Sequence, residues 1–180
     1  NAQKKFALQE QHKPQPKQYV SGETFYLQSR ALRLKVIRAS KEQLYSDGVH
    51  LFLEVKDPQD FSKKERMVMR FFDRQCKEVF GEIVEELYPV FQKYGVAVPS
   101  LRIRSMDTRW GSCLPGKGVI TLNKRLLEAP RNCIEYVVMH ELCHFIHPNH
   151  SKHFYAFLSM LMPDWKERKK VLDANDTYYL

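Results

Sequence analysis

The residues best suited to chemistry are histidines gathered in one short segment. Five of the seven histidines lie between residues 140 and 153. Within it, His140, Glu141 and His144 form an H-E-x-x-H pattern. On a helix, side chains four residues apart share one face, so the two imidazoles could bind one metal ion. The carboxylate of Glu141 could then act as a general base toward a metal-bound water.

A third ligand is expected, because catalytic zinc usually has three protein ligands and one open position. His150 follows the Pro148-Asn149 pair, which is suited to turning the chain back, and the resulting H-x3-H-x5-H spacing matches zincins whose third ligand follows a turn. Those zincins carry glycine where His147 stands here. On a continued helix, His147 would lie about 10 Å from the first ligand along the axis. His153, a carboxylate or the absence of a third protein ligand remain alternatives to His150.

The elements that position these residues are predicted from the spacing of apolar side chains. Apolar and polar residues alternate in three runs, 24–27, 32–36 and 49–55. This pattern predicts an N-terminal antiparallel β region over residues 18–57, with one face buried. Residues 1–17 are polar and contain two prolines, which predicts a flexible arm.

Helices dominate the rest of the chain. Apolar residues recur at steps of three and four from Val68 to Leu87, which predicts an amphipathic helix over about residues 60–88. Pro130 suits the start of a helix that runs to about His147, and Ser151 can cap the next one. Further elements are predicted as strands at 101–104 and 119–122 and as a last helix after Pro163-Asp164. The order of elements predicts an α+β fold.

Composition restricts the class of protein. The chain has 29 Lys and Arg against 21 Asp and Glu, a formal charge of +8, and 43% apolar residues, which is enough for a packed core. No apolar run approaches the ~20 residues that span a bilayer, so we expect no membrane insertion. The positive charge indicates either a solvated surface or association with nucleic acid.

The cysteines indicate the redox environment. The four cysteines include no C-x-x-C pair and are too sparse for a disulfide scaffold. We therefore predict buried thiols and a cytoplasmic location. These cysteines are Cys76, Cys113, Cys133 and Cys143.

Three segments resemble the YgjP-like family of metal-dependent hydrolases. They are T-R-W-G-S-C at 108–113, I-T-L-N at 120–123 and V-V-M-H-E-L-C-H at 137–144, the last followed by N-H-S at 149–151 and Phe154. Their order and spacing fit from about residue 100 to 160, and Y-V-S-G at 19–22 is similar to the family's N-terminal part. Members often carry Trp where Tyr155 stands here.

The resemblance implies a zincin-like metallopeptidase domain, which we assign to residues 58–180. It also implies His140, His144 and His150 as the metal ligands. The family is similar to the SprT-like proteases, which act on DNA-bound proteins. Those proteases commonly add a cysteine-rich zinc ribbon, which this sequence lacks.

The sequence therefore predicts a zinc metallopeptidase with one catalytic Zn²⁺. Glu141 would take a proton from the metal-bound water and pass it to the leaving amine of a peptide or protein substrate. The alternative is a basic nucleic-acid-associated protein with a structural or vestigial metal site. Candidate groups to stabilise the oxyanion are Arg109, Tyr136 and Tyr155.

The W-G-S-C segment at 110–113 has two interpretations. Trp110 could pack in the core while Gly111 permits a bulge or a tight approach. Alternatively, this segment or the strand at 119–123 borders the cleft, where an extended peptide could add to its edge.

Overall fold

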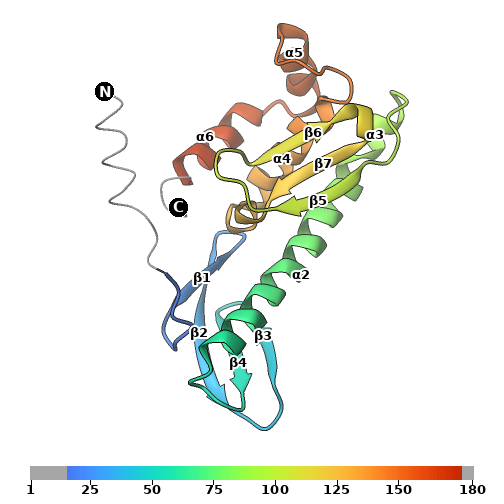
Figure 1. Ribbon diagram of the computed structural model, residues 1–180. Helices are drawn as coiled ribbons and strands as arrows, with labels where there is room; N and C mark the ends of the chain where they lie inside the picture. Colours follow the sequence, from blue (N-terminus) through green and yellow to red (C-terminus); the bar gives the residue numbers. More distant parts are fainter. Residues whose placement is uncertain (1–15, 176–180) are drawn as a thin grey trace.

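The structure is a computed structural model that describes residues 16–175, so most of the predicted arm over residues 1–17 lies outside the described residues. Two sheets and a set of helices follow one another along the chain, which confirms the α+β class (Figure 1). Within residues 16–175, no helix is both long enough and apolar enough to cross a membrane.

The N-terminal sheet has four strands: β1 (Thr24–Leu27), β2 (Arg30–Arg38), β3 (Gln43–Ser46) and β4 (His50–Val55). Their order is β1-β2-β4-β3, and β2 pairs with β4 in parallel. The expectation of an entirely antiparallel sheet is therefore wrong for this central pair. Period-two alternation fixes which face of a strand is buried but not the direction of its neighbour. The fully buried Leu51, Leu53 and Val55 place β4 inside the sheet, and the short β3 takes the edge.

The long helix α2 (Phe61–Leu87) confirms the predicted amphipathic helix. Its first N–H groups are capped by Asp60, whose carboxylate accepts a hydrogen bond from the backbone N–H of Lys63. Val68 and Phe71 pack into one hydrophobic core with the N-terminal sheet, whereas Phe80 and Ile83 belong to a second core. Helix α2 thus links both cores (Figure 1). A short helix, α3 (Pro89–Gln92), follows it.

The second sheet has three strands: β5 (Ser100–Arg104), β6 (Gly111–Leu114) and β7 (Val119–Asn123). Their order is β5-β7-β6, with β5 parallel and β6 antiparallel to the central β7. Strand β6 is therefore an edge strand. Short 3-10 turns, η1 (Pro115–Lys117) and η2 (Lys124–Glu128), flank β7.

Three helices complete the fold: α4 (Arg131–Cys143), α5 (Lys152–Leu161) and α6 (Trp165–Asn175). Ser151 caps α5 as predicted, its hydroxyl accepting a hydrogen bond from the N–H of Phe154. Helix α4 ends at Cys143, four residues earlier than expected. The tight turns that follow it carry N–H to C=O bonds such as Phe145 to Leu142, and they start the reversal that brings the chain back to α4.

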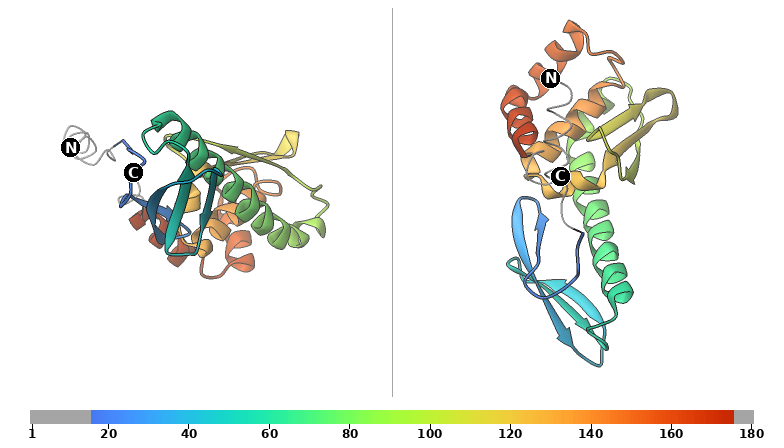
Figure 2. Two further views of the ribbon diagram at one scale, coloured as in Figure 1. Left: turned by 90° about the horizontal axis from the view of Figure 1, so that it is seen from below. Right: turned by 60° about the vertical axis from the view of Figure 1, so that its left-hand side comes forward.

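The β1–β2 hairpin joins the two halves of the molecule (Figure 2, right). At its tip, Gln28 and Ser29 have φ values of 47° and 62°. Their backbone N–H groups donate to the carbonyl oxygens of Leu127 and Glu128 at 2.8 and 2.7 Å. The hairpin tip is thereby fixed to η2, immediately before the helix that carries the H-E-x-x-H pattern.

Candidate metal centre

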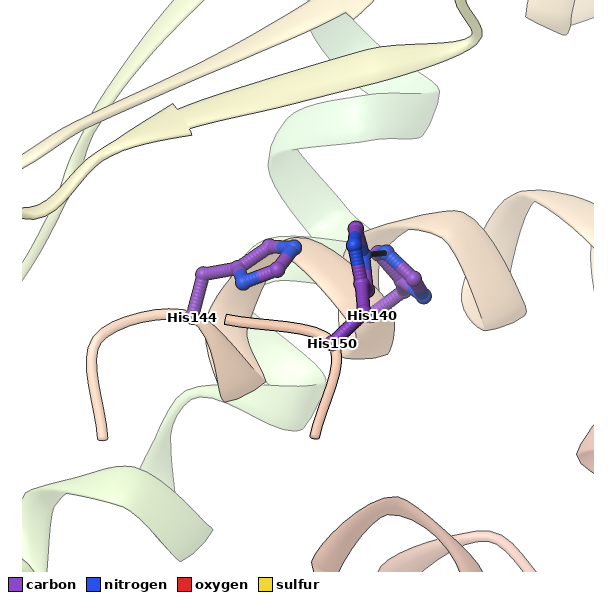
Figure 3. Close-up of side chains that lie close together, drawn as sticks. All are labelled: His140, His144 and His150. Carbon is purple, nitrogen blue, oxygen red and sulfur yellow. Dashed lines mark hydrogen bonds between the residues drawn. The ribbon is translucent and has the colours of Figure 1, made fainter. Parts of the chain in front are cut away.

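Three histidine side chains meet at the C-terminal end of α4 (Figure 3). His140 and His144 project from successive turns around the end of the helix, and the reversed chain returns His150 to them. One ring nitrogen from each lies within 4.8 Å of the others. The Nε2 atoms of His140 and His150 are 2.9 Å apart. The structure thus brings together the three residues selected from the sequence.

Hydrogen bonding orients His144. Its Nδ1 lies 3.2 Å from the carbonyl oxygen of His147, so an N–H at this position can donate to that carbonyl. This bond would fix the tautomer that leaves the Nε2 lone pair available. His147 therefore contributes through its backbone, while its ring packs against Phe157. His153 is exposed on α5 and is not part of the cluster.

A buried phenylalanine forms the floor beneath the cluster. Phe154 has no exposed surface, and its ring centroid lies 4.8, 4.7 and 5.0 Å from those of His140, His144 and His150. The first turn of α5 thus packs against all three imidazoles. This packing restricts their rotamers and excludes water from below.

The donor set fits a zinc ion. Burial lowers the pKa of His140 to about 3, with further lowering by His144, His150 and Lys169, so the ring is neutral as a metal ligand must be. Burial also lowers the pKa of His144. Nitrogens that surround tetrahedral zinc at its usual bond length are about 3.3 Å apart. The 2.9 Å between His140 and His150, and separations within 4.8 Å throughout the cluster, are compatible with this value. Neutral nitrogens that face each other this closely share either a proton or a cation.

Glu141 lies beside the cluster in an almost closed environment. Only 6% of the residue is exposed, and burial raises the pKa of its carboxyl to about 7 while Arg109 opposes the rise. A Cβ atom on Gly111 would lie 3.0 Å from Oε1 of Glu141. The tight approach expected at this glycine therefore exists, and it is an approach to the candidate base.

The histidines and Glu141 open into a cleft of about 590 Å³. Strand β6 forms one wall, so the expectation that the 110–113 segment borders the cleft is confirmed. Trp110 both lines the cleft and packs against the core, which reconciles the two interpretations of that segment. Helix α6 supplies another wall, which the sequence did not predict. The residues from α6 that line the cleft are Lys169, Leu172 and Asp173.

Two of the three candidate oxyanion groups line this cleft. Arg109 comes from the loop before β6 and Tyr136 from α4, and burial raises the pKa of Tyr136 to about 12, which keeps its hydroxyl protonated. Tyr155 is not among the lining residues. Its ring stacks on His150 at 6.2 Å and on Trp165 at 5.4 Å, so it supports the cluster from behind.

Asn123 is a positioning residue whose function the sequence alone did not reveal. It is 98% buried, and its side-chain amide donates to the carbonyl oxygens of Met106 and Arg109 at 2.7 and 2.8 Å. Its backbone N–H also donates to the carbonyl of Trp110 at 2.9 Å. Asn123 thus holds the loop that delivers Arg109. Its place in the I-T-L-N segment and a polar side chain at the end of an apolar strand were the available signals.

Trp165 is a second positioning residue whose function the sequence alone did not reveal. Its ring stacks on Tyr136 at 6.2 Å as well as on Tyr155, and its indole N–H donates to the hydroxyl of Ser159 at 2.8 Å. These contacts hold the start of α6 against the cluster. No local pattern predicts them, because they join residues from three different helices.

One family model and two solved structures are similar to this chain. The family model described as YgjP-like, metallopeptidase domain, matches residues 2–175. No curated protein matches the chain. Among solved structures, the metallopeptidase zymogen jannalysin of Methanocaldococcus jannaschii is 22% identical with a TM-score of 0.45, covering 53% of this chain and 95% of that one. The metallopeptidase zymogen abylysin of Pyrococcus abyssi is 20% identical with a TM-score of 0.47, covering 55% and 93%.

The family match extends over nearly the whole chain and includes every residue of the histidine cluster, Glu141 and the cleft walls described above. It agrees with the resemblance carried by the sequence motifs. The chain therefore belongs to the YgjP-like family, and it is a metal-dependent peptidase whose substrates are peptides or proteins.

Proposed function

We propose that the metal is zinc and that His140, His144 and His150 hold it. The observation that carries this proposal is the convergence of three imidazoles beside a buried glutamate in one open cleft. Bound zinc would act as a Lewis acid toward the scissile carbonyl and toward a water molecule. Three imidazole ligands suit zinc well among the divalent metals.

Glu141 is the general base in this proposal. Its raised pKa of about 7 lies near neutral pH, where a carboxylate can both accept a proton from water and return it to the leaving amine. Arg109 or Tyr136 would supply positive charge or an O–H donor toward the oxygen of the scissile carbonyl. Both residues line the cleft.

Strand β6 would bind the substrate backbone. The bond from the N–H of Asn123 to the carbonyl of Trp110 directs Trp110 toward β7, and in an antiparallel ladder alternate residues point the other way. The backbone groups of Gly111 and Cys113 are therefore free to pair with an extended peptide. Both residues line the cleft, so a peptide added to this edge would pass Glu141.

Substitution of the base separates metal binding from catalysis. Glu141→Gln keeps the size of the side chain and removes the basic oxygen, so zinc content should stay near one ion per chain while cleavage of a peptide library falls at least 1000-fold. Mass spectrometry of the digests gives cleavage, and elemental analysis gives zinc. Wild-type turnover by Glu141→Gln would refute the role of Glu141.

The alternative is a structural or vestigial metal site in a nucleic-acid-associated protein. A structural zinc site is closed by four protein ligands. In the part of the chain that the structure describes, the cluster has three ligand residues and opens into the cleft. This arrangement favours catalysis. The cytoplasmic location stays a prediction, supported by four cysteines that are all free and three of which are buried.

A further inference from the structure

The solvent face of α2 carries a row of cations. Arg66, Arg70, Arg74 and Lys77 are all exposed and follow one another at steps of four, four and three residues. At 100° per residue, this spacing places them on the side of the helix opposite Val68 and its core neighbours. We call these four residues the basic stripe.

The basic stripe is not neutralised within the described residues. Among the ion pairs of residues 16–175, none involves a member of the stripe. Two neighbouring carboxylates on α2 interact with other residues. Asp73 pairs with Lys124 at 2.5 Å, and Glu78 accepts a hydrogen bond from the side-chain amide of Gln75. By contrast Lys63, one turn before the stripe, pairs with Glu42 at 2.6 Å.

The stripe does not help α2 to form. Arg66, Arg70 and Arg74 are like charges four residues apart, an arrangement that destabilises a helix. They also lie in the N-terminal half, whereas the helix dipole favours anions near the N-terminus and cations near the C-terminus. The first turn of α2 has no acidic residue, and its last turn has no basic one. Helix stability therefore does not explain this charge distribution, but an external polyanion would.

We propose that the basic stripe binds the phosphate backbone of double-stranded nucleic acid. It extends about 16 Å along the helix. One strand of a duplex carries a phosphate every 3.4 Å of its axis, so the stripe is about as long as five phosphates of one strand. Met69 is the one exposed large apolar side chain between these cations, and no aromatic ring among residues 66–77 is exposed, so stacking on single-stranded bases is not favoured. Binding would be independent of base sequence.

The stripe lies away from the cleft. The N-terminal half of α2 extends along the N-terminal sheet, whereas α4, whose C-terminal end carries His140 and His144, lies behind the second sheet (Figure 1). A duplex bound there would bring the peptidase to nucleic-acid-associated proteins without blocking the cleft. The inference does not rest on the proposed zinc chemistry, and the two can fail separately.

Fluorescence polarisation with a labelled 20-base-pair DNA, between 50 and 200 mM KCl, tests the proposal on the full chain. The stripe variant carries Arg66→Gln, Arg70→Gln and Arg74→Gln. The control variant carries Lys93→Gln, Lys117→Gln and Lys170→Gln, three exposed lysines elsewhere. Both lose three positive charges, so net charge is matched.

In a plot of log affinity against log salt concentration, the slope for the stripe variant should be less negative than that of wild type by about 2.7. Between 50 and 200 mM KCl, wild type should therefore lose about 40-fold more affinity than the stripe variant. The control variant should keep the wild-type slope, and the stripe variant should keep its peptidase activity and its Tm. Equal losses in both variants would assign binding to net charge and overturn the proposal. Failure of wild type to bind the duplex at 50 mM KCl would also overturn it, as would tighter binding to the single strand or to anionic vesicles.

Discussion

Gly111 approaches Glu141 so closely that a Cβ atom on the glycine would lie 3.0 Å from both Cγ and Oε1 of the glutamate. The same atom would lie 3.1 Å from Cγ1 of Val137. The edge strand β6 therefore runs directly over the turn of α4 that carries the base. Gly111 thus fixes the orientation of the Glu141 carboxylate. It also fixes the distance between this carboxylate and β6, the strand proposed to pair with the substrate peptide.

Gly111→Ala should displace either Glu141 or β6. A displacement on the order of 1 Å in a catalytic group costs about 100-fold in rate, so we expect that loss in kcat/KM with zinc content unchanged. Gly116→Ala is the matched control, because a Cβ there meets nothing within 4 Å. The close approach is functionally irrelevant if both variants cleave peptides at the wild-type rate.

Asn123→Ala should free the loop that carries Arg109. The substitution leaves two carbonyl oxygens, those of Met106 and Arg109, without the amide donor of Asn123. We expect the free energy of unfolding in urea to fall by about 1–3 kcal/mol, together with a rise in KM as Arg109 becomes less ordered. Asn132→Ala, at an exposed position on α4, should change neither quantity. An unaltered urea midpoint for Asn123→Ala would show that Asn123 does not hold this loop.

The sequence predicted the elements whose signals are local. The apolar spacing of 68–87 defined α2, and Ser151 marked the start of α5, because helix periodicity and capping depend on residues a few positions apart. The histidine cluster was predictable for the same reason. Two ligands lie one helical turn apart on the same face, and the third follows a chain reversal.

Features that join distant segments were not predictable in this way. The parallel pairing of β2 with β4 depends on the path of the chain across the sheet. The alternation of apolar and polar residues is the same whether neighbouring strands run parallel or antiparallel. The early end of α4 at Cys143 depends on tertiary packing of the reversed chain over Phe154. The stacking of Trp165 on Tyr136 brings α6 to the cleft through contacts between residues almost 30 positions apart.

Glu128 should make stability depend on pH. Burial raises the pKa of its carboxyl to about 7, against opposing effects of Arg125 and Lys17, from an ordinary value of 4.5. The folded chain then holds a proton that the unfolded chain releases, so unfolding free energy falls as pH rises from about 4.5 to 7. Glu128→Gln should remove this decrease of the unfolding free energy with rising pH.

The measurement is the free energy of unfolding of Glu128→Gln minus that of wild type, at pH 4.5 and at pH 8. This difference should be larger at pH 8 by on the order of 1–3 kcal/mol. Glu85→Gln, at an exposed position on α2, should show no such change. The same difference at both pH values for Glu128→Gln would contradict a raised pKa of the Glu128 carboxyl in the folded chain.

Zinc affinity of two single variants tests the central claim most directly. His150 and His153 are both exposed histidines in the same short segment, but the cluster includes only His150. In competition with a chelating dye, wild type and His153→Ala should bind one zinc ion with equal affinity, and His150→Ala should bind it at least 100-fold more weakly. Wild-type affinity in His150→Ala, or a matching loss in His153→Ala, would contradict zinc coordination by His140, His144 and His150.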